Sequence, residues 1–447
     1  MSDITQELEE IHQQPPQQVE DEVTIDIKTM IQDSGNGNLL PECCIYKVPP
    51  PIRDLKPKAY TPQVVSIGPF HHGNERLLEM EKHKQIMFKR FTQRVKRFTQ
   101  RTMVSLDDLV RHVKKLEPKV RASYSEHINL TEQGLVKLTL MDAGFIIELF
   151  IMFYEGREGK IINNDAKLSQ QWLVNALILD LLLLENQLPL FIIEELFNKA
   201  LSPSITNLPE FRVLTYEFFK FHNHQNLEPT LDLRIKHFTD LLRLFNVQRT
   251  MPPESSFREV ENHVLLYNAS ALQEAGIKFK DSMSKCLLDL KFSGHILEIP
   301  KILVEDRTEL LFRNMIALEQ CHYLNASYIT NYALVLDCLI NTNKDMDLLI
   351  HNNIVNNIMV DSNEVAMLFN GLCKNVIHLN FNSEYLDICK RLNGFCQDPR
   401  NKMKATLRRD YCRTPWQIVA SIAVIVLLIL TLVQTICSIL QVAYIED

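Results

Sequence analysis

Apolar residues recur every three or four positions over most of the chain, the spacing that places them on one face of an α-helix. The clearest case follows Gly73, where four apolar side chains fall within one narrow arc: Phe88, Phe91, Val95 and Phe98. The same periodicity predicts helices over residues 139–154, 170–184, 190–200, 233–245, 308–324, 328–341 and 362–374. Pro189 should end the run that precedes it, because proline cannot donate a helical hydrogen bond.

Three short segments, 277–280, 287–292 and 295–299, instead alternate apolar with polar residues and are separated by turn-like sequence. This period of two is typical of half-buried strands. The expected fold is therefore mainly α: a multi-helix globular body with a small antiparallel β-sheet, plus one C-terminal transmembrane helix.

The transmembrane helix is predicted from the apolar run Ile418 to Leu440, which contains no Lys, Arg, Asp or Glu. At about 1.5 Å of rise per residue, the run is long enough to cross a hydrocarbon core of roughly 30 Å. Its position predicts insertion after translation, as in tail-anchored proteins. Its length suits the plasma membrane better than thinner membranes.

The flanks of this run predict its orientation. Basic residues precede it at Lys402, Lys404, Arg408, Arg409 and Arg413, and none follows it, so the positive-inside bias places the body in the cytosol. The acidic N-terminus, which lacks the basic and apolar regions of a signal peptide, agrees. The alternative, an extracellular body, would make three glycosylation sequons usable, at Asn129, Asn268 and Asn325.

Composition divides the chain into five regions. Residues 1–40 are rich in Gln, Glu and Pro and are expected to form a disordered acidic leader. Residues 41–410 form the predicted helical domain. It is followed by a juxtamembrane segment at 411–417, the span at 418–440 and a short tail at 441–447.

Composition and motifs argue against several common classes of function. A net charge of −7 gives no reason to expect nucleic acid as a partner, and only 12 glycines among 447 residues disfavour glycine-cradled phosphate sites. The sequence has no P-loop, dinucleotide-binding, nucleophile-elbow or zinc-protease motif. The 10 cysteines include no C-x-x-C pair and should remain thiols in a reducing cytosol. We therefore expect no enzymatic activity, no cofactor and no metal.

One histidine pair invites a metal-binding interpretation. His71 and His72 could bind metal together with Cys43, Cys44 and His83. Structural zinc sites usually combine closely spaced ligands from two short motifs, and these residues are not spaced in that way. Packing within a structured loop is therefore the favoured interpretation.

Four carboxylates lie in otherwise apolar helices: Asp142, Glu148, Asp180 and Glu185. Burial there would raise their pKa values and suit acid–base catalysis. The two members of each pair do not share a helical face, however, so roles at helix ends or in ion pairs are favoured. A hydrolase that uses these carboxylates is the alternative.

Six basic residues lie opposite the apolar arc of the helix after Gly73: Lys89, Arg90, Arg94, Lys96, Arg97 and Arg101. One interpretation is an ordinary solvated face. The other is a patch that faces lipid, since a tethered body would lie close to an anionic leaflet.

Four polar residues at helical spacing form a stripe within the predicted span: Thr431, Gln434, Thr435 and Ser438. Such side chains can hydrogen-bond across helices and would allow a homo-oligomer, although Ser and Thr can also bond the backbone of a lone anchor. Cys412, just before the span, is either a palmitoylation site or an unmodified thiol.

Several sequence blocks resemble one known family, in order and over essentially residues 43–440. They are CCIYKVPPPIRDLKPKAYTPQVVSIGPFHHG (43–73), LEMEKHK (78–84), MDAGFIIELF (141–150), DLLLLENQLPLFII (180–193), LQEAGIKFK (272–280), HILEIPKILVEDRTELLFRNMIALEQC (295–321), EVAMLFNGLCK (364–374) and TPWQIVASIAVIVLLILTLVQTICSIL (414–440). The family is the plant domain-of-unknown-function family 247, also called uncharacterised protein family 0481. The chain departs from it at Ala143 and Gly144, where the family often has Gly and then Cys.

This resemblance implies a land-plant, membrane-associated protein without an established enzymatic activity. Some grass members are associated with pollen-side self-incompatibility, and others with defence or hybrid incompatibility, which implies recognition or signalling. The expected function is therefore that of a membrane-anchored interaction protein, whose partners are membrane lipid and proteins not identified by the sequence. A membrane-bound hydrolase is the alternative.

Overall fold

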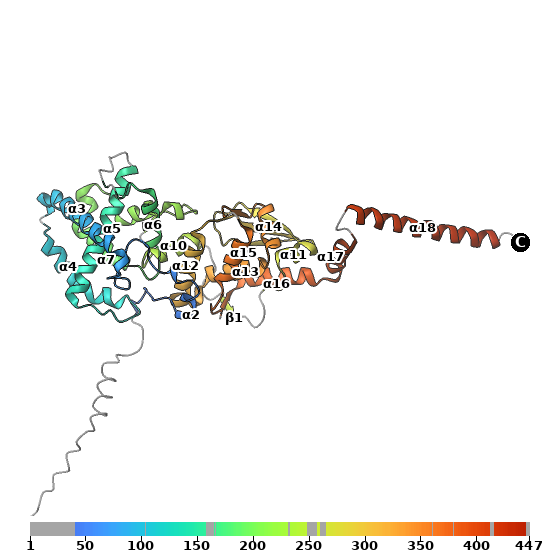
Figure 1. The fold of residues 1–447 in the computed structure, drawn as a ribbon, viewed down its shortest axis with the longest axis horizontal. Coiled ribbons are helices and arrows are strands. Elements are labelled where there is room, and N and C mark those ends of the chain that lie inside the picture. The colour runs from blue at the N-terminus through green and yellow to red at the C-terminus, as the bar shows by residue number, and fades with distance from the viewer. Residues whose placement is uncertain are drawn as a thin grey trace, which may run out of the picture. The chain divides into compact units, whose positions relative to one another are not determined.

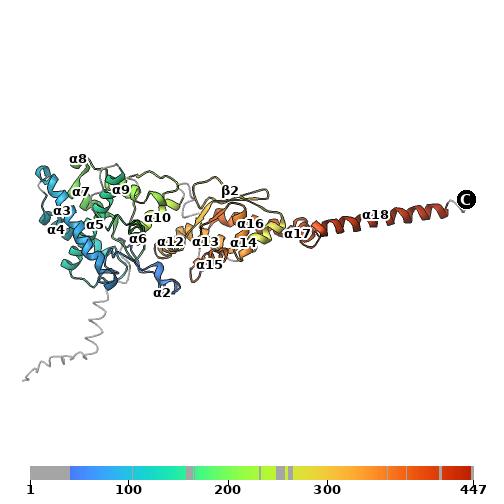
Figure 2. The same ribbon diagram turned by 45° about the horizontal axis from the view of Figure 1, so that its top comes forward.

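Helix α5 (Glu132–Arg157) is the most buried long element of the body. Its sequence is apolar on nearly every side from Leu135 to Met152, and such a helix is stable only when other elements cover it. Four helices pack against it, as Figures 1 and 2 show: α3 (Leu78–Thr102), α4 (Leu106–Ala122), α7 (Leu190–Leu201) and α9 (Phe211–Phe218).

The structure is a computed structural model of the chain. It describes residues 41–102, 104–157, 165, 167–230, 233–247, 257–259, 265–359, 361–378, 380–411 and 415–443. The predicted acidic leader at 1–40, Cys412 and the end of the predicted tail from residue 444 lie outside the described residues.

The other helices divide into two sets by chain order, one up to α10 and one from α11 onward. The two sets are in contact where α10 packs on α12. The first set comprises α2 (Pro50–Arg53), α6 (Gln171–Asp180), α8 (Pro203–Thr206) and α10 (Phe238–Asn246). The second comprises α11 (Ala269–Ala275), α12 (Thr308–His322), α13 (Tyr328–Leu339), α14 (Asn343–His351), α15 (Ser362–Leu372), α16 (Ser383–Gln397), α17 (Pro399–Tyr411) and α18 (Pro415–Ala443). Single 3₁₀ turns occur at Pro57–Ala59, Glu75–Leu77, Lys220–His222 and Leu324–Ala326. The predicted mainly helical fold is confirmed.

Helix α10 begins at Phe238 and not at the predicted residue 233, because a histidine caps it. The Nδ1 atom of His237 accepts a hydrogen bond from the backbone N–H of Asp240 at 3.3 Å, as an N-cap side chain does. The other ring nitrogen, Nε2, lies 2.9 Å from the carbonyl oxygen of Cys44. Since Nδ1 accepts, Nε2 carries the proton and donates it, so the buried neutral ring ties the N-terminal segment to α10.

The predicted strands form one three-stranded sheet of β2 (Lys278–Ser282), β3 (Lys291–Ser293) and β4 (Ile296–Pro300), with β4 in the middle. β3 and β4 pair antiparallel, as predicted. β2 and β4, however, pair parallel, with Phe279 opposite Leu297, so the sheet is mixed and not antiparallel throughout. Alternation of apolar residues specifies which face a strand buries but not the direction of its neighbour.

Two further strand pairs lie between residues 257 and 382. β1 (Phe257–Glu259) pairs antiparallel with β7 (Asn380–Asn382), and β5 (Ile302–Val304) pairs parallel with β6 (Val355–Asn357). Each strand is three residues long. Such strands are too short for a period of two to be recognised in the sequence.

Helices α3 and α5 approach closely at Gly144. A Cβ atom added there would lie 2.5 Å from Cδ2 of Phe88 and 3.2 Å from Cδ1 of Phe91. We predict that Gly144→Ala lowers the free energy of unfolding by about 1–3 kcal/mol through overpacking.

The matched control is Gly394→Ala in α16, where a new Cβ would have no neighbour within 4 Å. This control should stabilise the protein by up to about 1 kcal/mol through helix propensity. Urea unfolding of the full chain in detergent, followed by circular dichroism, measures both changes. Equal effects of the two alanines would contradict the close approach.

Candidate functional site

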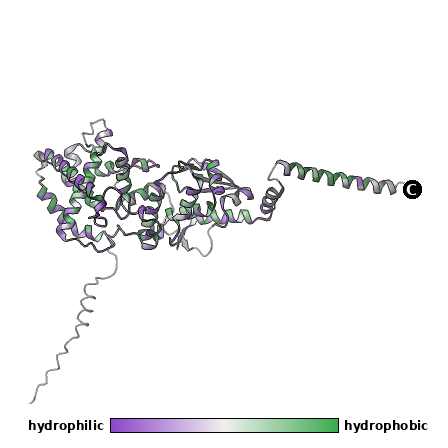
Figure 3. Cartoon of the chain, viewed as in Figure 1, coloured by the Kyte–Doolittle hydropathy of each residue, from purple (hydrophilic) through white to green (hydrophobic). Residues whose placement is uncertain are grey.

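Helix α18 is apolar and is not covered by the described part of the body. Its segment Pro415–Ile439 is long and apolar enough to cross a membrane, and 0% of its most apolar window is buried. Leu427, Leu428 and Leu430 are exposed by 66%, 63% and 62%, and Figure 3 shows the hydrophobic colour of this helix. Leaving such a side chain in water forgoes about 1.5–3 kcal/mol of burial energy. α18 contains the predicted span, and the side chain of Leu440 lies outside the described residues.

The polar stripe in α18 is mostly satisfied within the helix. Thr431 Oγ1 donates to the carbonyl of Leu427 at 2.7 Å, Thr435 Oγ1 to that of Thr431 at 2.7 Å, and Ser438 Oγ to that of Gln434 at 2.9 Å. The side chain of Gln434 makes no hydrogen bond to the residues that the structure describes. Gln434 is therefore the stripe residue with unused hydrogen-bonding capacity.

Arg94 does not belong to the predicted lipid-facing patch on α3. Its Nε and Nη2 each lie 2.9 Å from a carboxylate oxygen of Glu148, and its Nη1 lies 2.8 Å from Glu155. Its side chain is 17% exposed, so it faces α5 and not a bilayer. The bidentate pair also accounts for the buried Glu148.

The other predicted patch residues divide into two groups. Arg90 Nη1 lies 2.9 Å from Asp165 and is 31% exposed, so its charge is also engaged. Lys89, Lys96 and Arg97 are exposed. The side chain of Arg101 lies outside the described residues. The structure therefore reduces the basic face, among residues it describes, to Lys89, Lys96 and Arg97.

The remaining buried carboxylates hold residues 48–68, which include α2 and one 3₁₀ turn, against the longer helices. Asp180, at the end of α6, accepts three backbone N–H groups from Gln63, Val64 and Val65 at 2.7–3.1 Å. Burial outweighs these bonds and raises the pKa of Asp180 to about 6. The carboxylate thus satisfies three backbone N–H groups of residues that belong to no helix or strand.

Glu185 holds the start of the same segment. It accepts the N–H of Val48 at 2.9 Å and lies 3.1 Å from Nε of Arg53 and 3.4 Å from Nε2 of His71. Burial alone would raise its pKa, but the bonds from His71, Val48 and Arg53 lower it, so Glu185 stays ionised.

Asp142 anchors the end of the segment from α5. It accepts the N–H of Gly68 at 2.8 Å and pairs with Nζ of Lys84, which also donates to the carbonyl of Ser66 at 2.8 Å. A Cβ atom at Gly68 would lie 2.3 Å from the carbonyl oxygen of Gln187, and its φ of +72° is one that glycine adopts readily. Only glycine fits this position.

These contacts bear on the catalytic interpretation of the carboxylates. Asp142, Asp180 and Glu185 bind backbone N–H groups, and Glu148 binds an arginine. None of the four lines the cavity between α10 and α12 or the more open hollow beside it. Their arrangement supports structural roles, because each carboxylate is hydrogen-bonded to backbone or arginine groups and lies outside these two cavities.

The residues proposed as metal ligands do not converge. Among the residues that the structure describes, no three His, Cys, Asp or Glu side chains are placed to hold a metal ion. His71 contacts Glu185, and His83 lies 3.3 Å from Asp165. The thiol of Cys44 is buried, which raises its pKa to about 12 and keeps it protonated.

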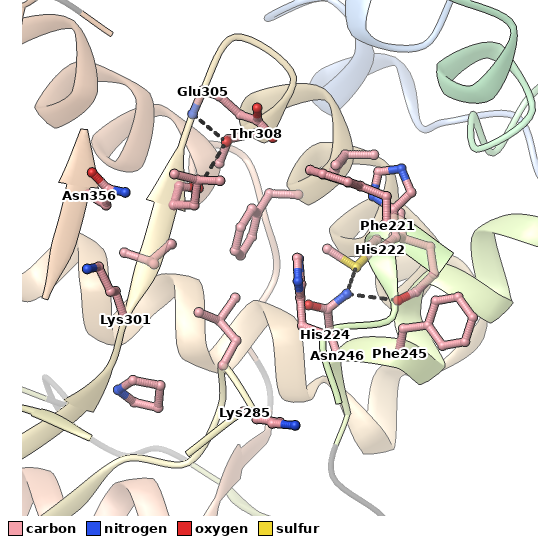
Figure 4. Close-up of a pocket in the computed structure, with 18 of the residues that line it drawn as sticks. Phe221, His222, His224, Phe245, Asn246, Lys285, Lys301, Glu305, Thr308 and Asn356 are labelled. Carbon is pink, nitrogen blue, oxygen red and sulfur yellow. Dashed lines mark hydrogen bonds between the residues drawn. The ribbon is translucent and has the colours of Figure 1, made fainter. Parts of the chain in front are cut away.

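A cavity of about 390 Å³ lies where α10 and α12 meet β5 and the end of β4. Figure 4 shows Phe221, His222 and Phe245 on one side of it and Lys301 on the other. A second, more open hollow of about 670 Å³ shares Phe221 and His222 with the first.

No pattern in the sequence indicates this cavity. Its described lining residues come from positions 221–224, 242–246, 284–287, 300–315 and 356, which no motif connects. The packing of α10 on α12 and the pairing of β5 with β6 bring together segments that are distant in the sequence.

Comparison with known proteins identifies the family. A family profile, DUF247, described as "Plant protein of unknown function", matches residues 45–430. The chain belongs to the DUF247 family. The sequence resemblance described above is therefore confirmed.

Relatives in Arabidopsis thaliana agree with this DUF247 assignment. The chain is 29% identical to UPF0481 protein At3g47200, over 91% of this chain and 87% of the relative. It is 22% identical to a second UPF0481 protein, At3g02645, over 87% of this chain and 89% of the relative. No solved structure matches the chain.

The DUF247 match covers more than the helical body. It runs from Ile45, which is buried, to Leu430 in α18. The family region therefore includes the first part of the exposed apolar helix. The family description assigns no biochemical activity.

Proposed function

We propose that this DUF247 protein is a single-pass membrane protein whose cytosolic body binds other proteins in recognition or signalling. The observation that carries the proposal is α18, an apolar helix with no cover from the described part of the body. A bilayer would remove its side chains from water, and the helix satisfies its own backbone N–H and C=O groups internally. Anchoring would confine the body and its partners to one surface.

Charge supports a cytosolic body close to the membrane. Lys402 and Lys404 belong to α17, directly before the apolar helix, and the positive-inside bias keeps such residues in the cytosol. Lys89, Lys96 and Arg97 remain exposed and could contact an anionic leaflet, which is the lipid-facing interpretation in its reduced form. The length of α18 favours the plasma membrane.

Binding is favoured over catalysis because the buried carboxylates are engaged with backbone groups and an arginine. The hydrolase alternative needs at least one of them free beside a substrate cavity. Whole-chain activity against ester substrates that depends on Asp180 would favour that alternative.

Two arginines in the middle of α18 should release the protein from membranes. Leu428→Arg with Leu432→Arg places each charge where insertion costs about 2.5–3.5 kcal/mol. We predict that the wild type stays in the pellet after alkaline carbonate extraction and that this variant moves to the supernatant. The control is Leu266→Arg with Leu324→Arg, at leucines exposed on the body.

Intact cells that express the wild-type protein test the orientation. Protease added outside intact cells should leave the wild-type body uncut, and permeabilisation should expose it. A wild type that carbonate extracts, or a body that external protease digests, would show that the proposed anchor or its orientation is wrong.

Self-association through the membrane should depend on Gln434. The Gln434→Leu variant removes the stripe residue whose side chain is not bonded to the described residues, and an interhelical bond in lipid contributes about 0.6–2 kcal/mol. We predict lower energy transfer between two tagged copies of this variant. Thr431→Val, which loses only a bond to its own helix, is the control and should leave transfer unchanged. Unchanged transfer in Gln434→Leu would contradict a homo-oligomer built on this residue.

A further inference from the structure

The floor of the cavity between α10 and α12 is apolar. Leu242, Phe245, Phe312 and Met315 are each buried and line it. Its volume of about 390 Å³ is at the lower end of the range for small-molecule sites. Such a space suits a compact apolar body, for example two fused rings.

The mouth of the cavity is positively charged. Lys285 and Lys301 line it, are exposed, and form no ion pair with the residues that the structure describes. Glu305, the acidic residue among the described lining residues, is paired with the guanidinium of Arg307. Thr308 places the N-terminus of the 15-residue helix α12 at the same cavity, which adds partial positive charge. An anionic group is therefore favoured at the mouth.

His222 supplies a polar atom inside the cavity wall. His222 is 5% exposed, and its Nε2 atom has no hydrogen-bond partner in the described part of the chain. Burial, together with the charge of Arg307, lowers the pKa of His222 to about 4, so the ring is neutral at cytosolic pH. A buried ring nitrogen without a partner is one that a ligand can satisfy.

We infer that this cavity binds a small cyclic carboxylic acid. Its ring body would lie against the apolar side chains of Phe312 and Met315, its carboxylate within reach of Lys285 or Lys301, and a further polar group at Nε2 of His222. The site lies outside α18, so the inference can fail or succeed independently of membrane anchoring.

The test uses the full chain in lipid nanodiscs and naphthalene-2-carboxylate as the probe. Equilibrium dialysis, with empty nanodiscs subtracted, should show saturable binding that weakens as salt is raised, because the lysines are exposed. Naphthalene-2-carboxamide has a similar shape without the charge and should bind about tenfold more weakly. No saturable binding above the empty nanodiscs, or equal binding of acid and amide, would overturn the inference.

Matched variants locate the site. Lys285→Gln with Lys301→Gln should raise the Kd for naphthalene-2-carboxylate about tenfold, whereas Lys278→Gln, an exposed lysine on β2 that does not line the cavity, should leave it unchanged. If the double variant and Lys278→Gln lost the same affinity for naphthalene-2-carboxylate, the binding would depend on general surface charge, and the proposed site would be wrong.

A second comparison of two ligands tests the role of His222. In the wild type, 6-hydroxynaphthalene-2-carboxylate should bind more tightly than the acid without the hydroxyl. His222→Phe keeps an aromatic ring and removes the nitrogen, so it should abolish this preference. A preference that survives in His222→Phe would contradict the assignment of Nε2.

Discussion

Acidification from pH 7 to pH 4 should cost the folded protein about 3 kcal/mol at His237 alone. The ring is fully buried, and burial lowers its pKa to about 4, whereas an unfolded histidine has a pKa of 6.5. Between these values the unfolded chain binds a proton that the folded chain does not. The stabilisation is therefore present above pH 6.5 and is lost as the pH falls towards 4.

Other groups titrate in the same interval, so the contribution of His237 has to be measured as a difference. Burial lowers the pKa of His222 to about 4 as well, and it acts in the same direction. Asp180 acts in the opposite direction, because its pKa is raised to about 6 and its contribution is lost as the pH rises through that value. The change in the free energy of unfolding on acidification is the sum of the contributions from all these groups.

His237→Asn isolates the histidine. Asparagine can still cap α10 but cannot titrate, and it gives up the bond to Cys44. At pH 7 we expect the wild type to be more stable than the variant, and by pH 4 this gap should narrow by about 3 kcal/mol. Urea unfolding of the full chain in detergent at both values measures the gap.

The control is His127→Asn, at an exposed position, which accounts for the general effect of replacing histidine by asparagine. A gap for His237→Asn that stays constant down to pH 4 would mean that the folded protein protonates this ring without cost. The buried N-cap interpretation would then be wrong.

Removal of Lys84 should be the most destabilising single change among the buried ion pairs. Lys84 is 1% exposed and Asp142 is 0% exposed. Burial works against the ammonium, but the carboxylates of Asp142 and Glu81 raise the pKa of Lys84 and keep it charged. Lys84→Met leaves the carboxylate of Asp142 without its cation, which typically costs about 3–5 kcal/mol.

Removing both Lys84 and Asp142 tests whether the unpaired buried charge causes the loss of stability. Lys84→Met with Asp142→Leu should be destabilised less than Lys84→Met alone, since no uncompensated charge stays buried. Urea unfolding of the full chain in detergent gives the free energy of each variant. A double variant at least as unstable as Lys84→Met would show that the bond from Asp142 to the N–H of Gly68 outweighs the buried charge.

Local sequence was enough to predict the helical class of the fold and the apolar run that becomes α18. Both depend on periodicity or length within one segment, and neither needs a partner. Ordered sequence blocks were also enough to predict the family. The spacing of Asp142, Glu148, Asp180 and Glu185 disfavoured paired use on one helical face, which stays a prediction.

The tertiary structure decided where individual polar side chains are directed. A helical projection placed Arg94 on the basic face of α3, but Glu148 and Glu155 on α5 turn it towards the body. The backbone groups that Asp180 binds lie more than 100 positions away in the sequence. The parallel partner of β2 and the cavity at His222 likewise require segments that meet only after folding.

The physical reason is the range of the forces involved. Hydrophobic periodicity acts through neighbours three or four residues apart, so the sequence by itself was enough to predict many of the helices and the apolar span, although it missed helices such as α4 and α16. A buried charge or N–H group must find a partner wherever the chain supplies one, and that choice depends on the whole packed arrangement.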